Sequence, residues 1–330
     1  MKAKLQVTRA IPTGNREEGR TYVLHYEKDY EVMEVVEMLD QTGIFEFTEP
    51  NYVGYGGGQR GVAVSSIPND SYFSRQWGLY NDGSFSLASA TNDADVDMEL
   101  AWDIEQGSAG VTIAVLDAGT NLGHPELVGR LWTNPNDPTN NGVDDDGNGF
   151  KDDFQGWDFA NNDNDPSDDN GHGTNVLGII GANANNNLGY AGVDWHCKLM
   201  TCKVLNSSNQ GFYTWWVDGI YYAVDEGADI INMSLGGSTT STLLQSAIDY
   251  AYNNGVTVVA CMMNEDNNVT YYPAGYANTI AVGALDPDNT RSDPFFWSAT
   301  SGSNYGNHID VVAPGNFTYG LHYSNNSLLQ

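Results

Sequence analysis

The chain has 330 residues, of which 43 are acidic and 13 basic, and its formal net charge is −30. This excess of negative charge argues against a nucleic-acid partner, which needs a basic face, and against docking on an anionic membrane surface. With 40% hydrophobic and 12% aromatic residues, the composition predicts packed globular domains and suits an extracellular protein that binds divalent cations.

The N-terminal part of the chain predicts a small α+β domain over residues 1–55. Residues 22–26 and 44–47 alternate like strands, and residues 32–39 carry valine and leucine at helical spacing. Residues 56–67 are rich in glycine and serine and predict a linker. We therefore interpret residues 68–330 as a second, larger domain.

The second domain alternates predicted strands with predicted helices. Apolar runs typical of buried strands occupy residues 110–116, 197–205, 229–235, 256–260, 278–283 and 309–312. Helical patterns occupy residues 176–180, 212–226 and 243–253. Because strands without polar alternation need cover on both faces, the expected fold class is α/β, with a doubly wound parallel sheet and helices on both faces. Functional sites in such sheets form at the carboxyl ends of strands.

Three polar residues of this domain stand in contexts typical of a serine hydrolase. Asp117 ends the first strand, His172 begins a helix within Asn-Gly-His-Gly-Thr, and Asn264 follows the 256–260 strand. A carboxylate that orients an imidazole, the imidazole as base and an amide that stabilises the oxyanion are the set that this chemistry needs. Taken singly, Asp117 is equally typical of a turn, His172 of a surface helix start and Asn264 of a loop. Their order and contexts together favour catalysis.

These motifs resemble the subtilase family of serine proteases over nearly all of residues 68–319. The resemblance implies a subtilisin-like serine endopeptidase that cleaves peptide or protein substrates through an acyl-enzyme. It also implies that an extended peptide adds as a β-strand between the two edges of a cleft. The substrate-binding residues implied in this way are Gly211, Ser234, Leu235 and Gly236.

Several residues depart from the family pattern. Ala118 stands where the family usually has Ser or Thr, which implies that a hydrogen bond supporting the catalytic carboxylate is missing. Met262 and Met263 stand where small residues usually precede the oxyanion asparagine, and their bulk narrows the pocket or displaces that asparagine. Glu265 adds negative charge beside the oxyanion site and opposes the developing charge.

The Gly-Thr-Ser segment that carries the family's nucleophile does not occur in the chain. Residues 310–315 match the segment that precedes it, whereas Ser324 and Ser327 lack the Gly-x-Ser context of a strand-to-helix turn. We expect the chain as given to be a fragment without its catalytic serine and to be inactive. The alternative is a pseudoprotease that acts as a peptide- or calcium-binding module. A third class, an acidic adhesion or scaffold module, is supported only by the charge and an acidic loop.

Residues 21–53 resemble the end of the subtilase propeptide, and residues 69–79 resemble the start of the mature enzyme. This implies a zymogen whose own propeptide is a partner of the catalytic domain, with processing near residues 56–67. It also implies a secreted or extracellular protein, although residues 1–10 lack the apolar centre of a signal peptide.

An acidic loop at residues 141–153 predicts a structural calcium site. Oxygen-bearing side chains fall at alternate positions, a glycine follows them at the turn, and further ligands come from a carbonyl and a water-bridged carboxylate. The ligands expected on this spacing are Asp144, Asp146, Asn148, the carbonyl of Phe150, and Asp152. Gln155 at the twelfth position argues against an EF-hand, and a solvated Asn/Gly turn is the alternative.

Overall fold

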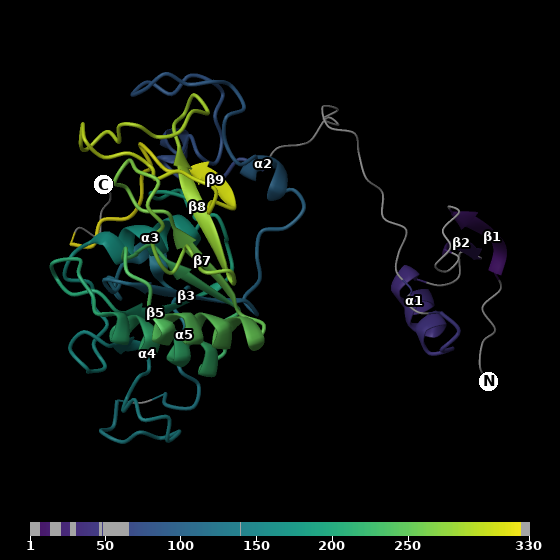
Figure 1. Ribbon diagram of the computed structural model, residues 1–330, viewed down its shortest axis with the longest axis horizontal. Coiled ribbons are helices and arrows are strands. Elements are labelled where there is room, and N and C mark those ends of the chain that lie inside the picture. Colours follow the sequence, from purple (N-terminus) through teal and green to yellow (C-terminus); the bar gives the residue numbers. More distant parts are fainter. Residues whose placement is uncertain are drawn as a thin grey trace. The chain divides into compact units, whose positions relative to one another are not determined.

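The structure, a computed structural model, describes residues 7–13, 21–26, 31–45, 48, 66–138 and 140–324. Its contacts divide the chain into two units, Met1–Val62 and Ala63–Gln330, and each is described by itself (Figure 1). Within the described ranges, no helix combines the length and apolar character that crossing a membrane requires.

The first unit contains an antiparallel hairpin and one helix. β1 (Val7–Thr13) pairs with β2 (Thr21–Tyr26), and α1 (Val32–Asp40) follows. The strand predicted at 22–26 and the helix predicted at 32–39 are present, whereas β1 was not predicted. Residues 44 and 45 form no strand, and residues 46–47 and 56–65, which include most of the predicted linker, lie outside the described residues.

The second unit is built on a seven-stranded sheet with the order β4-β5-β3-β6-β7-β8-β9, in which every neighbouring pair is parallel. The strands are β3 (Thr112–Asp117), β4 (Trp157–Asp158), β5 (Lys198–Lys203), β6 (Ile230–Met233), β7 (Thr257–Cys261), β8 (Thr279–Leu285) and β9 (Val311–Pro314). The six apolar runs all form strands, and the predicted α/β fold class is confirmed. The two-residue strand β4 was not predicted.

Three long helices and three short ones accompany the sheet. The long helices are α3 (His172–Gly181), α4 (Tyr213–Asp225) and α5 (Thr242–Asn253). The short ones are η1 (Phe73–Arg75), α2 (Met98–Ala101) and η2 (Pro125–Leu127).

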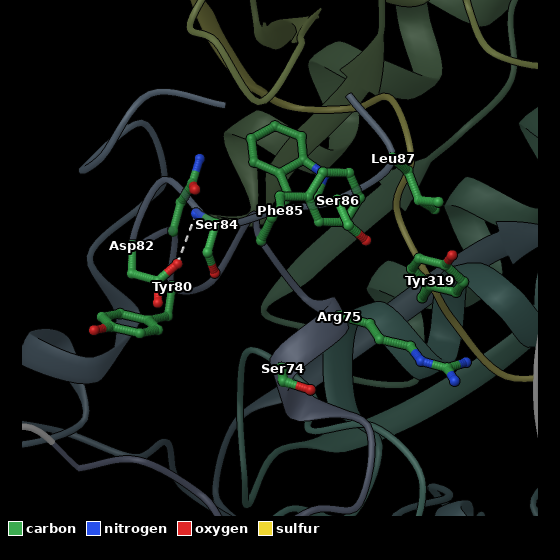
Figure 2. Close-up of a pocket in the computed structure, with 11 residues that line it drawn as sticks. Ser74, Arg75, Tyr80, Asp82, Ser84, Phe85, Ser86, Leu87 and Tyr319 are labelled. Carbon is green, nitrogen blue, oxygen red and sulfur yellow. Dashed lines mark hydrogen bonds between the residues drawn. The ribbon is translucent and has the colours of Figure 1, made fainter. Parts of the chain in front are cut away.

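Around η1, a cavity of about 380 Å³ is lined by Arg75, Phe85 and Tyr319 among others, and none of the predicted site residues borders it (Figure 2).

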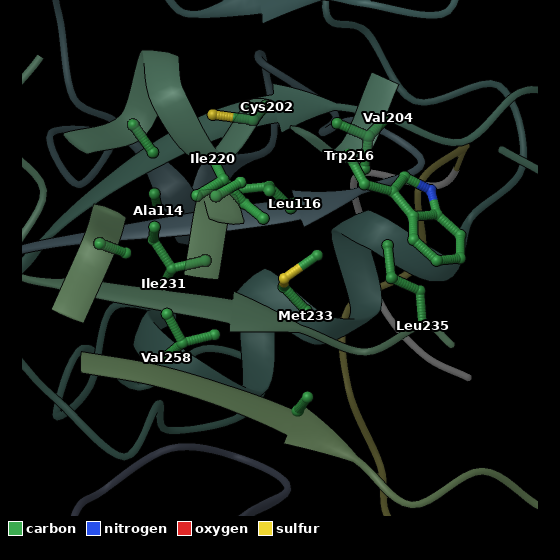
Figure 3. Close-up of a cluster of buried hydrophobic side chains, with 14 of the residues drawn as sticks. Ala114, Leu116, Cys202, Val204, Trp216, Ile220, Ile231, Met233, Leu235 and Val258 are labelled. Carbon is green, nitrogen blue, oxygen red and sulfur yellow. The ribbon is translucent and has the colours of Figure 1, made fainter. Parts of the chain in front are cut away.

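The core lies on both faces of the sheet. Ala114 and Leu116 of β3 pack into the cluster that α4 and α5 cover. The two helices lie side by side below the sheet in Figure 1. Side chains of this cluster are drawn in Figure 3. Ile113 and Val115 of the same strand pack with Leu177 of α3 in a separate cluster. Successive side chains of one strand therefore serve opposite faces, and burying each large apolar side chain contributes roughly 1.5–3 kcal/mol.

A close backbone approach holds α3 against the end of β3. A Cβ on Gly173 would lie 2.1 Å from the carbonyl oxygen of Gly119, so only glycine allows this contact. Because Gly119 follows Asp117 by two residues and Gly173 follows His172 directly, the contact fixes the start of the helix beside the end of the strand.

Candidate active site

Asp117 and His172 form a close hydrogen-bonded pair. Nδ1 of His172 lies 2.7 Å from Oδ1 of Asp117, and the Nδ1–H group donates to the carboxylate. The Asp117 carboxylate is fully buried, whereas the His172 side chain is 37% exposed. The pair thus joins a buried acid to an imidazole that reaches solvent. The second nitrogen of the imidazole, Nε2, is left to accept a proton.

Asp168 holds the first turn of α3 in place. Its Oδ1 accepts from the backbone N–H groups of Asn170 (2.9 Å) and Gly171 (2.7 Å). Its Oδ2 accepts from the backbone N–H (2.9 Å) and the hydroxyl (2.6 Å) of Thr174. Asp168 was not predicted as a site residue, because it lies three residues before Gly171, the N-cap residue of α3, and not at the capping position itself.

The two carboxylates set the proton affinity of His172. Burial by itself lowers the pKa of His172, but the charge of Asp117, their shared hydrogen bond and the charge of Asp168 together raise it above the ordinary value of 6.5. The arrangement therefore favours a protonated imidazole, the state that a general base reaches after taking a proton.

Asn264 lies in the turn after β7, and its residue is exposed. No hydrogen bond joins its side-chain amide to another residue in the part of the chain that the structure describes. The carboxylate of Glu265 instead turns back to accept the backbone N–H of Asn264 (3.0 Å), and the amide of Asn304 also reaches it (3.5 Å). The Asn264 amide is thus available to an oxyanion, with a carboxylate nearby.

A cavity of about 520 Å³ adjoins this turn. The structure brings the four predicted substrate-binding residues to its wall, together with Met263. Aromatic side chains form the rest of one side, and the rings of Tyr213 and Trp216 stack with centroids 4.6 Å apart. The aromatic wall was not predicted as part of the site, because the helical pattern at 212–226 marks these residues as core. The cavity combines the segment that follows β6 with an aromatic wall, which suits an extended peptide.

Residues 108–329 match the family model described as Subtilase family, Peptidase_S8. The chain belongs to the subtilase family.

Two curated relatives illustrate the similarity. A thermophilic serine proteinase of Bacillus sp. (strain AK1) is 34% identical over 307 residues, which cover 93% of this chain and 63% of that protein. Thermitase of Thermoactinomyces vulgaris is 37% identical over 253 residues, which cover 76% of this chain and 75% of thermitase. The chain thus spans less than two thirds of the length of the first of them.

A solved structure has the same fold. The crystal structure of a cold adapted subtilisin-like serine proteinase superposes with a TM-score of 0.55 and 26% sequence identity, covering 77% of each chain. These comparisons agree with the resemblance that the sequence motifs indicate.

Within the described residues of this subtilase, one oxygen of the Asp117 carboxylate has no hydrogen-bond partner. Oδ1 of Asp117 accepts from His172 and from the backbone N–H of Ala118 (2.7 Å). Oδ2 is buried without a hydrogen bond in the described structure. Ala118 is itself fully buried and offers only a methyl group next to this carboxylate, which agrees with the missing hydrogen bond expected from the sequence.

Carboxylates of the acidic loop of this subtilase accept hydrogen bonds from the loop's own backbone. Oδ1 of Asp144 accepts the backbone N–H of Gly147 (2.6 Å). Oδ1 of Asp152 accepts those of Asn141 (2.7 Å) and Gly142 (2.9 Å) at the beginning of the loop. The ring of Phe150 packs in the core against Tyr222.

Hydrogen bonds connect Asp146 and Asn148 of the loop with residues outside their predicted ligand set. The amide of Asn148 donates to Asp153 (3.2 Å) and to Glu226, the residue that follows α4 (2.9 Å). The amide of Asn134 donates to Asp146 (3.0 Å) and to Asp153 (2.8 Å). Burial raises the pKa of Asp153 and that of Glu226. Glu226 lies far along the sequence, so no local pattern could assign it to the loop.

A second candidate cation site joins Asp70 to Glu126. Both residues are buried, and Oδ1 of Asp70 and Oε2 of Glu126 have no partner within the described ranges. Their other oxygens accept from the backbone N–H of Asn185 (2.6 Å) and the amide of Asn186 (3.2 Å), so one loop binds both. Burial, with a smaller contribution from Asp70, raises the pKa of Glu126 to about 7. The sequence analysis missed this pair.

A third acidic group lies in the segment before β3. Among the described residues, the ligand atoms of Asp95, Asp97 and Glu99 lie within 4.8 Å of one another. It is the one group of three or more acidic, histidine or cysteine side chains in those ranges that meets this distance.

Proposed function

We propose that this subtilase is a serine-type endopeptidase of the subtilisin kind, which cleaves peptide bonds through an acyl-enzyme. The observation that carries the proposal is the 2.7 Å contact between the fully buried Asp117 carboxylate and Nδ1 of His172. Asp117 fixes the tautomer that leaves Nε2 of His172 as the base, and Asn264 donates to the oxyanion.

The substrate we propose is an extended peptide or protein chain in the 520 Å³ cavity. All four predicted substrate-binding residues line this cavity. We propose that the backbone of Ser234, Leu235 and Gly236 forms one edge and Gly211 the other, so that main-chain hydrogen bonds supply much of the affinity. We further propose a secreted zymogen in which the first unit serves as the propeptide and cleavage within residues 56–67 separates it from the second.

The nucleophile is the part of the mechanism that these 330 residues do not supply, since they contain no Gly-Thr-Ser. We expect no labelling of this chain by an active-site phosphonate probe and no hydrolysis of casein. A chain extended by that segment in the family's position is expected to be labelled at the added serine, and His172→Ala is expected to abolish the labelling. Labelling of Ser324 or Ser327 in the original chain would contradict the proposal.

A pseudoprotease that binds peptides without cleaving them is the second candidate. The orphaned Oδ2 of Asp117 and the carboxylate of Glu265 beside the oxyanion amide favour it. The same extended chain distinguishes the two functions. A pseudoprotease binds peptides in the cleft but leaves casein intact even when the serine segment is present.

We also propose that calcium stabilises the fold. The buried, unpartnered oxygens of Asp70 and Glu126 suit a hard cation with oxygen ligands, and the loop at 141–153, with Asp146, Asp153 and Glu226 drawn together, is the second place. At either place the cation offsets the repulsion and desolvation of buried carboxylates.

Chelation is expected to lower the thermal midpoint in a pH-dependent way. The folded protein holds the proton of Glu126 up to a pKa of about 7, whereas an ordinary glutamate loses it near 4.5. Without a cation, the free energy of unfolding therefore falls by about 3 kcal/mol as pH rises between these two values. In excess EDTA the free energy of unfolding therefore falls between these pH values, and calcium removes most of the fall. Glu126→Gln should make this fall in EDTA clearly smaller, because it removes the Glu126 contribution.

A midpoint that is the same in EDTA and in calcium at pH 7 would contradict the proposal of structural calcium. Asp95→Asn is the matched control for the Asp70–Glu126 site, because it removes a carboxylate from the separate group before β3. It should leave the pH dependence of the chelated protein in place.

A further inference from the structure

Met263 occupies a backbone position that favours glycine. Its φ of +70° lies in the left-handed region, and it comes between the end of β7 and the oxyanion residue Asn264. A long side chain at this point must project from a tight turn at the edge of the cleft, and its contacts decide what the cleft can accept.

The side chain of Met263 lies against the Ser234–Gly236 edge of the cleft. Its Sδ and Cγ atoms lie 3.0 and 3.1 Å from the position that a Cβ on Gly236 would take. The Sγ atom of Cys261 lies 3.6 Å from the same sulfur and 3.9 Å from the carbonyl oxygen of Leu235. The two sulfurs therefore fill the space between the end of β7 and the Ser234–Gly236 edge.

Cys261 acts as packing in this arrangement. Burial raises the pKa of its thiol to about 11, so the thiolate is scarce at neutral pH and the residue is a poor nucleophile. Its contact with Met263 instead braces the methionine side chain from behind.

An extended peptide that pairs with the Ser234–Gly236 edge and offers a carbonyl oxygen to Asn264 must pass over Met263. We infer that Met263 is a specificity-determining residue, which restricts the residue that supplies the reacting carbonyl to glycine or alanine. The inference rests on the proposed function, because it needs the peptide in this cleft and the oxyanion at Asn264.

The rest of the cleft stays open to a large side chain. The cavity of about 520 Å³ extends along the aromatic wall of Phe212, Tyr213 and Trp216. A bulky apolar residue elsewhere in the same peptide fits this wall. The expected ligand is therefore a peptide with one large apolar anchor and a small residue at the reacting carbonyl.

The test is equilibrium binding of amidated peptides Phe-Ala-Pro-X to the protein by calorimetry, with X as Gly, Ala or Phe. The wild-type protein should bind the Gly and Ala peptides at least about tenfold more tightly than the Phe peptide, the scale expected when a pocket excludes a side chain. Met263→Gly should reduce the difference to less than about threefold. This variant should fold, because glycine accepts the left-handed φ without strain.

Met263→Leu is the matched control, since it keeps the bulk and should keep the preference for small residues. Equal binding of Gly and Phe peptides by the wild-type protein would overturn the inference, and so would a Met263→Gly variant that discriminates as before. Failure of every peptide to bind either protein would remove the cleft of the proposed function itself, and is thereby distinguished from a failure of the Met263 inference alone.

Discussion

Asp117→Asn is expected to lower the pKa of His172 from its raised value. The charge of Asp117 and its hydrogen bond are the main influences that raise this pKa against the effect of burial, and the neutral amide supplies neither a charge nor a reliable acceptor. In a chain that carries the nucleophile, the same substitution should slow turnover by about four orders of magnitude, because the imidazole loses its productive tautomer.

The pKa can be measured on this chain by following the imidazole Cε1–H resonance of His172 with pH. Because the folded pKa is raised above 6.5, the pair stabilises the fold fully below that pH, and the contribution is lost as pH rises through the folded value. Asp117→Asn should remove this pH dependence. Asp168→Asn should lower the pKa of His172 by less, because Asp168 contributes less to it. An unchanged pKa of His172 in Asp117→Asn would contradict the role of Asp117 in raising it.

Lys203→Met is expected to cause the largest loss of stability of any single change discussed for this protein. The ammonium group is 3% exposed and lies 3.4 Å from the carboxylate of Asp158, which is 1% exposed, and 3.0 Å from that of Asp169. Removing one partner of a buried pair leaves an uncompensated charge, here on Asp158, and costs about 3–5 kcal/mol. Urea unfolding followed by tryptophan fluorescence measures the change.

Lys198→Met is the matched control, since Lys198 starts the same strand, β5, and its ammonium group donates only to the carbonyl of Gly129 (2.9 Å) at an exposed site. It should cost less than about 1 kcal/mol. The nearby acids outweigh burial and raise the pKa of Lys203, so its contribution is complete at neutral pH and is lost only as pH rises through that value. Equal urea midpoints for the two variants would contradict the role of the buried pair.

The Asp117–His172 pair illustrates how much local sequence patterns can predict. Asp117 was predicted from its place at the end of an apolar strand and His172 from its place at a helix start, and the structure brings them into contact. Asp168 lies three residues before the N-cap residue Gly171, so the capping rule did not predict it, and only the structure shows its hydrogen bonds to the first turn of α3. The short strand β4 could not, because two residues carry no periodicity.

The cation sites show the opposite case. The expected ligands of the 141–153 loop were chosen by spacing along the chain, and the structure adds a remote residue, because the amide of Asn148 donates to Glu226 at the end of α4. Asp70 and Glu126 come from separate segments, and only folding buries them around one loop. Spacing records neighbours along the backbone, whereas a carboxylate site is set by which segments meet and how much water they exclude.

The sequence by itself determined the α/β fold class and the order of the strands along the chain, and it predicted Asp117 and His172 as a pair, because each depends on a few consecutive residues. Only the tertiary structure decided that Lys203 is buried beside the carboxylates of Asp158 and Asp169, and that the side chain of Met263 lies across Gly236. These features depend on burial and on distances between remote segments, and packing of the whole domain fixes both.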